Sequence, residues 1–202
     1  DEEKRDPDTP CGLVNLGATC YVNSLLQVLF FDGKFREALY SWKPRQKSPK
    51  LGEGSEQFQN TRGLTLLQQE IIELMQSTFA HMQYGKTKSF NPRDFVAKLN
   101  LSTGIQQDGI EFNKLLLAML EQIFCHASMS NLNTFIQDRY GGELCYCTKC
   151  LECKNVSKRK APFYELELQI ENCSTVKESL DLYFKREELN GDNKYNCEMR
   201  CN

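Results

Sequence analysis

The apolar positions divide the chain into a helical first part and a β-rich second part. Residues 21–31 are almost continuously apolar, which predicts a buried helix. At 64–79 and again at 112–123, apolar side chains recur every three or four residues, which predicts two amphipathic helices. A shorter helix is expected to start at Asn91-Pro92, with Asn as its cap and Pro in its first position. The stripe at 112–123 consists of Phe112, Leu115, Leu116, Met119, Leu120 and Ile123.

After about residue 135 the pattern changes to an alternation of apolar and polar side chains. Residues 164–170 alternate as a half-buried strand does, and 141–150 are expected to form the partner strand. A further short strand is expected at 194–197, after a turn signal at 191–193. Helices first and strands later predict an α+β fold, with a helical lobe and a β-rich lobe that meet near residue 135.

Two stretches show neither pattern. Residues 1–10 are polar and charged, so we expect a disordered lead-in and not a secretory signal peptide. Residues 44–62 are polar and rich in Pro, Gly, Gln and Ser, which predicts a surface loop. No apolar run approaches the roughly 20 residues of a membrane span, so no membrane partner is expected.

Composition narrows the class of protein and its compartment. The chain has 202 residues, and its 25 basic and 27 acidic side chains give a formal net charge of -2, so nothing indicates nucleic acid as a partner. Ten cysteines are many for this length. Small disulfide scaffolds are loop-rich and lack long amphipathic helices, which this pattern predicts. We therefore expect a reducing compartment, cytoplasmic or nuclear, with thiols available for catalysis and metal binding.

The segment from Gly12 to Ser24 delivers a cysteine to the start of the buried helix. It reads Gly-Leu-Val-Asn-Leu-Gly-Ala-Thr-Cys-Tyr-Val-Asn-Ser. At Cys20, free backbone N–H groups and the positive end of the helix dipole favour the thiolate over the thiol. Such a thiolate is a nucleophile for acyl transfer, and the amide of Asn15 lies across the turn, within reach of the developing oxyanion. On spacing alone, a buried structural cysteine is the slightly better interpretation, since free cysteines are often buried.

A second polar segment opens the helix at 112–123. It reads Gln106-Gln107-Asp108-Gly109-Ile110-Glu111-Phe112, so Asp108 and Glu111 share one helix face. Taken alone, this pattern is typical of a helix cap, because acids and amides are favoured in a first turn.

The remaining cysteines have the spacing of a metal site. Four of them lie in the nine residues from Cys145 to Cys153, and a second pair, Cys197 and Cys201, follows. A C-x2-C pair on a hairpin turn with a second close pair is typical of tetrahedral zinc. Reduced thiols without a metal are the alternative.

Two of these segments resemble motifs of one enzyme family. The segment around Cys20 resembles the Cys box of the ubiquitin-specific proteases, Gly-Leu-x-Asn-Leu-Gly-Asn-Thr-Cys-Tyr-Met-Asn-Ser, and departs from it at Ala18 and Val22. The segment around Asp108 is similar to that family's Gln-Gln-Asp-x-x-Glu-Phe box. The resemblance implies an α+β, papain-like cysteine protease fold. It implies a helical thumb at 11–135 that carries both boxes and β-rich fingers at 136–202, with the palm largely missing.

The resemblance also implies roles for individual residues. Cys20 is the expected nucleophile and Asn15 the expected oxyanion-hole donor. The channel for the C-terminal tail of ubiquitin, which carries arginines before its Gly-Gly end, is expected to be lined by Gln106, Asp108 and Glu111. A structural zinc in the fingers is favoured, and its preferred ligands are Cys150, Cys153, Cys197 and Cys201, with Cys145 or Cys147 as substitutes.

The implied activity is that of a deubiquitinase. Such an enzyme hydrolyses isopeptide or peptide bonds after the C-terminal Gly of ubiquitin through a thioester with the cysteine. The two histidines, His81 and His126, do not lie in the Gly-His-Tyr context of the family's general base. We therefore expect a fragment of a longer enzyme that is inactive alone, with the catalytic His and its orienting Asp or Asn outside the chain. The alternative is a catalytically inactive module that binds ubiquitin.

Overall fold

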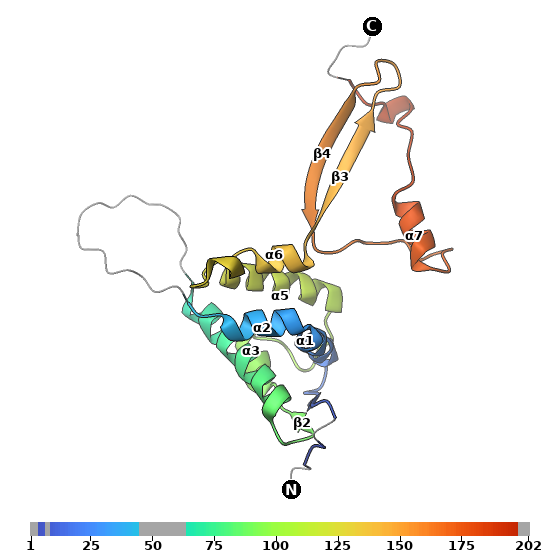
Figure 1. Cartoon of the computed structure of the whole chain (residues 1–202). Coiled ribbons are helices and arrows are strands. Elements are labelled where there is room, and N and C mark those ends of the chain that lie inside the picture. Colours follow the sequence, from blue (N-terminus) through green and yellow to red (C-terminus); the bar gives the residue numbers. More distant parts are fainter. Residues whose placement is uncertain (1–3, 7–8, 45–63, 198–202) are drawn as a thin grey trace, which may run out of the picture. The chain divides into compact units, whose positions relative to one another are not determined.

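The computed structural model in Figure 1 describes residues 4–6, 9–44 and 64–197. The chain divides into two compact units, Asp1–Arg139 and Tyr140–Asn202, close to the expected boundary near residue 135. The first unit is helical and the second contains a β-hairpin, so the architecture is α+β. The loop expected at 44–62 lies outside the described residues, apart from Pro44.

The first unit is built from helices of very different length. They are α1 (Cys20–Phe31), α2 (Gly33–Ser41), α3 (Leu66–Tyr84), α4 (Arg93–Lys98), α5 (Gly109–Phe124) and α6 (Phe135–Tyr140), with a 3-10 turn at Ser130–Leu132. A short parallel pair, β1 (Gly12–Leu13) and β2 (Ser89–Phe90), joins the segment before α1 to the segment after α3.

Local capping explains where several helices begin. The Asp32 carboxylate accepts hydrogen bonds from the first amides of α2, and Thr65 and Gln68 form a reciprocal capping box at the start of α3. The start of α4 differs from the prediction by one residue. Asn91 accepts a hydrogen bond from the Arg93 amide at 3.1 Å, and Pro92 occupies the cap instead of the first helical position.

Aromatic rings fill the core of the helical unit. Phe79 on α3 meets the rings of Phe30 and Phe35 at 5.4 and 6.2 Å, and Phe35 also stacks on Phe124. The indole of Trp42 is buried and donates a hydrogen bond to the carbonyl of Ile123 at 3.1 Å. These contacts tie α1, α2, α3 and α5 together around one apolar centre.

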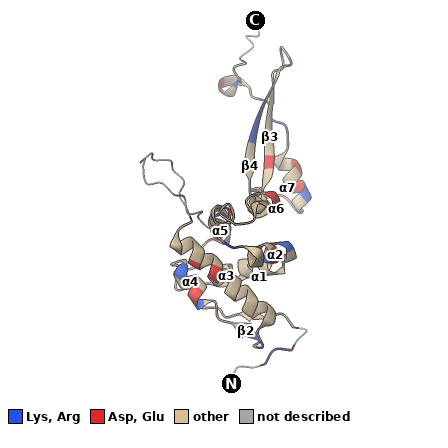
Figure 2. Cartoon of the chain, turned by 60° about the vertical axis from the view of Figure 1, so that its left-hand side comes forward, with Lys and Arg blue, Asp and Glu red and all other residues tan. Residues whose placement is uncertain are grey.

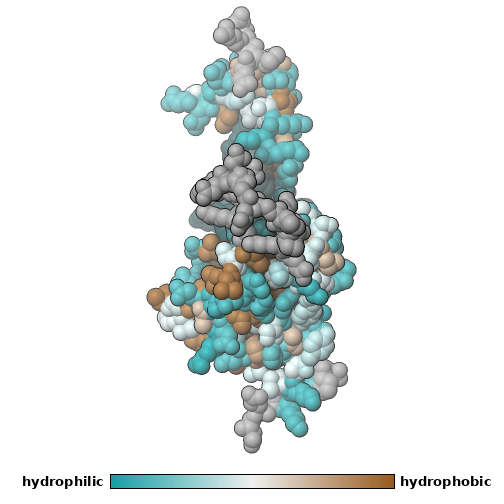
Figure 3. All heavy atoms as spheres, turned by 90° about the vertical axis from the view of Figure 1, so that its left-hand side faces the viewer, coloured by the Kyte–Doolittle hydropathy of each residue, from teal (hydrophilic) through white to brown (hydrophobic). Residues whose placement is uncertain are grey.

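The predicted stripe of α5 is wrong at one position. Leu115 is 64% exposed, whereas Leu116 is 2% and Leu117 4% exposed. The helical period turns Leu117 toward the core with Leu120 and Phe124, and turns Leu115 to the outside. Other large apolar side chains are also exposed on this unit, among them Leu66, Leu67 and Ile110, and Figure 3 shows hydrophobic groups interspersed with hydrophilic ones.

Part of the lead-in is held against the end of α3. The guanidinium of Arg5 donates hydrogen bonds to the carbonyls of Met82 and Gln83, at 2.6 and 3.1 Å, and the Arg5 amide donates to Lys86. A basic side chain satisfies the last carbonyls of a helix in this way. The disorder expected for residues 1–10 therefore does not extend to Arg5.

The second unit contains an antiparallel hairpin of β3 (Gly142–Lys149) and β4 (Val156–Phe163). The partner strand predicted at 164–170 is wrong, because the pairing register uses the eight residues before it and Ile170 is 82% exposed. The strand predicted at 194–197 is also absent from the described residues. A helix, α7 (Val176–Tyr183), and a 3-10 turn at Gly191–Asn193 complete this unit.

Cross-strand pairs explain why a strongly basic stretch forms β4. Figure 2 shows Lys and Arg along this strand. Lys160 pairs with Glu143 at 2.8 Å, and the guanidinium of Arg159 lies 4.7 Å from the ring centre of Tyr146. Such pairs stabilise a hairpin without an apolar face, so apolar alternation does not mark this strand.

None of the helices in the described part of the chain has the length and apolar character that crossing a membrane requires.

The neighbouring leucines of α5 provide a matched test of this packing. Leu116→Ala is expected to lower the free energy of unfolding of the helical unit by about 2–5 kcal/mol, because it leaves a cavity in the core. Leu115→Ala removes an exposed side chain and should change it by less than about 0.5 kcal/mol. Urea unfolding followed by helical circular dichroism measures both, and equal losses would contradict this placement of α5.

Candidate functional site

Cys20 begins α1, and its side chain is exposed. The first hydrogen bond of the helix runs from the amide of Asn23 to the carbonyl of Thr19, at 3.1 Å. The amides of Cys20 and the next two residues therefore precede the intrahelical ladder. An exposed thiol at this end of a helix lies beside groups that favour negative charge.

Hydrogen bonds between Asn15 and Thr19 fix the conformation of the turn before Cys20. The carbonyl Oδ1 of Asn15 accepts hydrogen bonds from the amide and the hydroxyl of Thr19, at 3.3 and 3.0 Å. The Thr19 hydroxyl in turn accepts from the amide of Leu16 at 3.0 Å. Because a backbone N–H can only donate, Asn15 must present its oxygen to Thr19, which leaves its NH2 group as the donor on an exposed side chain.

The same turn docks on the segment that precedes α5. The amide of Ala18 donates a hydrogen bond to the carbonyl of Thr103 at 2.7 Å. Gly17 has a φ of 114°, and a Cβ there would lie 2.4 Å from that carbonyl oxygen. Only glycine fits this position. At residue 18 it is the main-chain amide that makes the contact, whatever the side chain.

Polar side chains in the middle of α1 hold the segment before it. Asn23 donates from Nδ2 to the carbonyl of Val14 at 3.1 Å, and Gln27 donates to the carbonyl of Cys11 at 2.9 Å. These bonds explain two polar residues in an otherwise apolar helix. They fix the direction from which the chain enters the Cys20 turn.

Asp108 caps α5 and lies close to the start of α1. Its Oδ1 accepts hydrogen bonds from the amides of Ile110 and Glu111, at 2.7 and 3.3 Å. The Tyr21 ring meets the Phe112 ring edge-on at 5.1 Å, so the first turns of α1 and α5 are neighbours. Gln106, Asp108 and Glu111 are all exposed. The structure therefore brings the segment around Asp108 to the segment around Cys20.

The Tyr21 hydroxyl is buried and has no hydrogen-bond partner among the described residues. Burial raises the pKa of Tyr21, and the neighbouring Cys20 raises it further. The phenol is therefore neutral at physiological pH, and its ring packs against Phe112.

The two histidines lie in other surroundings. Nδ1 of His81 is hydrogen-bonded to the carbonyl of Ser77 at 2.8 Å, and its ring stacks on Phe90 at 4.5 Å. His126 is half-buried just after the end of α5. Within the described residues, neither histidine forms a hydrogen bond with Cys20.

Three cysteines of the second unit converge at the hairpin turn. The sulfur atoms of Cys150, Cys153 and Cys197 all lie within 4.8 Å of one another, and those of Cys153 and Cys197 are 3.7 Å apart. Two sulfurs bound at about 2.3 Å to a tetrahedral zinc ion are about 3.8 Å apart, so these donors fit zinc. Cys201, the fourth preferred ligand, lies outside the described residues.

The turn itself is held by main-chain bonds. The amide of Cys150 donates to the carbonyl of Asn155 at 2.9 Å, and the amide of Lys154 donates back to Cys150 at 3.1 Å. Cys145 and Cys147, expected as substitute ligands, are not part of the three-sulfur group. They lie along β3 and contact each other.

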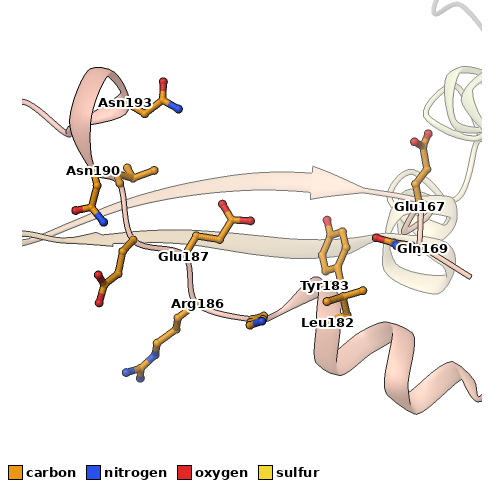
Figure 4. A pocket seen from close by; sticks show the side chains of 11 residues that line it. Glu167, Gln169, Leu182, Tyr183, Arg186, Glu187, Asn190 and Asn193 are labelled. Atoms are coloured by element: carbon orange, nitrogen blue, oxygen red, sulfur yellow. The ribbon is translucent and has the colours of Figure 1, made fainter. Parts of the chain in front are cut away.

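The second unit also has an open pocket of about 850 Å³. Figure 4 shows Leu182 and Tyr183 of α7 with charged and amide side chains of the segments around them. Its lining contains no cysteine or histidine. It therefore does not bring together the groups that thiol chemistry requires.

Comparison with known proteins shows to which family the chain belongs. The family model described as ubiquitin carboxyl-terminal hydrolase matches residues 11–201. The chain is similar to ubiquitin carboxyl-terminal hydrolase 48 of Danio rerio, at 39% identity over 196 residues, and of Gallus gallus, at 36%. These matches cover 97% of this chain and 18% of each relative. Ubiquitin carboxyl-terminal hydrolase 26 of Oryza sativa subsp. japonica is 32% identical over 95% of this chain and 16% of its own length.

The match confirms the resemblance inferred from the segments around Cys20 and Asp108. This family has the papain-like cysteine protease fold, and a helical unit followed by a small sheet is consistent with it. The chain spans less than a fifth of the length of these relatives. The sequence did not indicate a role for Thr103, because any type of residue can make a contact through its main-chain carbonyl.

The docking of the Cys20 turn can be tested with two glycines. Gly17→Ala is expected to destabilise the helical unit by roughly 1–3 kcal/mol, because its backbone is left-handed and the new Cβ meets the Thr103 carbonyl. Gly104→Ala, one residue from that carbonyl, places its Cβ in open space and should be close to neutral. Hydrogen exchange of the Ala18 amide should accelerate only in Gly17→Ala. Equal exchange in both variants would contradict the close approach of Gly17 to the Thr103 carbonyl.

Proposed function

This chain belongs to the ubiquitin carboxyl-terminal hydrolase family, and from that premise we propose that it is part of a thiol-dependent deubiquitinase. Its substrates are ubiquitin conjugates, and the bond cleaved is the isopeptide or peptide bond after the C-terminal Gly of ubiquitin. The observation that carries the proposal is the docking of the Cys20 turn on Thr103, because it places an exposed thiol beside the Asp108 helix start.

In this mechanism the Cys20 thiolate attacks the carbonyl carbon of the terminal Gly. The amine of the conjugated protein leaves with a proton, and a thioester between Cys20 and ubiquitin forms and is then hydrolysed by water. The negative charge on the tetrahedral intermediate is stabilised by the Asn15 NH2 group and the first amides of α1. The hydrogen bonds from Thr19 to Asn15 support this role, because they orient the Asn15 side-chain amide before substrate binds.

The general base is a histidine outside these 202 residues. The hydrogen bond of His81 to Ser77 and its stacking on Phe90 support this assignment, because they engage the ring elsewhere. The same observation favours the second candidate function, in which the chain alone binds ubiquitin without turnover.

Gln106, Asp108 and Glu111 form the acidic and polar wall of the channel for the ubiquitin tail. Their exposure beside the Cys20 turn supports this role. Carboxylates pair well with the arginines that precede the Gly-Gly end. Asp108 uses one oxygen to cap α5, so the cap holds the carboxylate in a fixed orientation for such a pair.

The helical unit corresponds to the thumb of the fold and the hairpin unit to the fingers. Cys150, Cys153, Cys197 and Cys201 would hold a structural zinc in the fingers, which would stabilise the fold and leave the chemistry to Cys20. The compartment that we propose is a reducing one, cytoplasmic or nuclear, because small disulfide scaffolds lack long amphipathic helices such as α3 and α5.

Two substitutions at Asn15 separate its catalytic role from its structural one. In a protein extended downstream with its natural sequence, Asn15→Asp keeps an oxygen for the Thr19 bonds but removes the NH2 donor. It should lower kcat for a fluorogenic amide of ubiquitin by about 100- to 1,000-fold with little loss of stability. Asn15→Ala should lose both activity and stability, because Thr19 is buried and loses its acceptor.

Cys20→Ala in the same extended protein should abolish turnover, and the 202-residue chain alone should show none. Calorimetry then measures whether the short chain binds ubiquitin. Binding is expected of an inactive fragment of a deubiquitinase, and no binding is expected of a domain unrelated to ubiquitin. Turnover by the short chain through Cys20 would overturn the assignment of the base. An active Asn15→Asp enzyme would remove Asn15 from the oxyanion site.

The metal assignment predicts a local effect. The chain should bind about one zinc ion, and Cys153→Ser should lose it, whereas Cys173→Ser, outside the three-sulfur group, should keep it. A chelator should change the unfolding of the second unit but leave the unfolding of the helical unit in place. Metal analysis after dialysis measures the first effect, and equal zinc content in both variants would refute the assignment.

A further inference from the structure

Cys145 and Cys147 form a second sulfur pair that the three-sulfur group does not use. They are two residues apart on β3, so both side chains lie on the same face of the strand, and both are exposed. Their sulfur atoms are 3.6 Å apart. The two thiols share a hydrogen bond, and this bond is the main cause that raises the pKa of Cys145.

The separation of the two sulfurs suits chelation better than a disulfide. A disulfide needs about 2.05 Å between its sulfurs and about 3.8 Å between its Cβ atoms, and alternate positions of an extended strand do not allow such Cβ atoms without bending the strand. Two sulfurs bound at about 2.3 Å to one tetrahedral centre are about 3.8 Å apart, close to the observed 3.6 Å. Both thiols therefore reach one ion without a change in the backbone.

The neighbouring strand supplies charge of the right sign. In the pairing register, Lys160 lies opposite Cys145 and Lys158 lies opposite Cys147. Directly opposed residues of an antiparallel pair share a face, so two ammonium groups flank the thiols. When the thiols lose their protons to a bound ion, the negative charge of the sulfurs is partly neutralised. Lys160 is also paired with Glu143, which anchors this end of the site.

We propose that Cys145 and Cys147 form a dithiol site that takes one thiophilic metal ion or metalloid centre through both sulfurs. The site is separate from the group of Cys150, Cys153 and Cys197. Thiolates select soft centres of this kind. Because the described residues supply two sulfur donors to this site and both are exposed, the ion keeps open coordination positions and exchanges readily. This distinguishes it from a zinc ion enclosed by four cysteines.

Phenylarsine oxide, a trivalent arsenical, is a suitable probe. Each sulfur forms a bond to arsenic, the bond between arsenic and oxygen breaks, and the two thiol protons leave with the oxygen as one water molecule. Arsenic stays trivalent, so no oxidant is required. The full chain is first loaded with zinc, which protects the three-sulfur group, and adducts are counted by intact mass spectrometry before and after an excess of a monothiol.

One arsenical per chain should form and resist the monothiol, while a competing dithiol should remove it. The double substitution Cys145→Ser with Leu144→Cys keeps the number of thiols but moves one to the other face of β3. Retention against the monothiol should then fall at least about tenfold, because the second sulfur no longer acts at high effective concentration. Cys147→Ser alone should give the same loss, and Cys125→Ser, which removes an exposed thiol of the helical unit, should give none.

Unchanged zinc content verifies that the hairpin turn stays folded in each variant. Retention of the adduct in Cys147→Ser or in the face-swapped variant would overturn the proposal. So would an adduct in the wild-type chain that the monothiol removes, or loss of the adduct in Cys125→Ser.

Discussion

One main-chain hydrogen bond, from the amide of Ala18 to the carbonyl of Thr103, determines the shape of the candidate site. It joins two segments that are far apart in the sequence, and it requires a close approach that only Gly17 permits. Without it, Cys20 would still begin a helix and Tyr21 would still contact Phe112, but the turn before Cys20 would lose its hydrogen bond to the segment before α5. Backbone contacts therefore position the site, and they set the places from which its side chains act.

The polar residues of this site serve structure and chemistry with different atoms. Thr19 is fully buried, so its amide and hydroxyl need an acceptor, and Oδ1 of Asn15 provides it. That requirement leaves the NH2 group of this exposed side chain as its hydrogen-bond donor. Asp108 behaves similarly, because one oxygen caps α5 while the carboxylate stays exposed. A capping interpretation and a functional interpretation of these residues are thus compatible, since the first fixes the geometry that the second needs.

The sequence predicted most reliably what burial imposes. The helices α1, α3 and α5 follow from apolar periodicity, because each buries one face. The strand β4 did not follow, because it is stabilised by contacts such as Lys160 with Glu143 and not by an apolar face, so the alternation at 164–170 was a misleading signal. The Cys20 and Asp108 segments were recognisable as motifs. Their contact through Thr103 was not, because a carbonyl belongs to every residue.

The two sulfur pairs of the second unit have nearly the same separation, 3.7 Å for Cys153 with Cys197 and 3.6 Å for Cys145 with Cys147. Separation alone therefore does not decide what each pair does. Cys153 and Cys197 join a third sulfur at a turn, so an ion bound there would close a loop of the chain and contribute to folding. Cys145 and Cys147 lie on a strand that backbone pairing already holds, so an ion there adds little to stability. It follows that the pair of Cys153 and Cys197 is suited to a permanently bound metal ion, and the pair of Cys145 and Cys147 to an ion that exchanges.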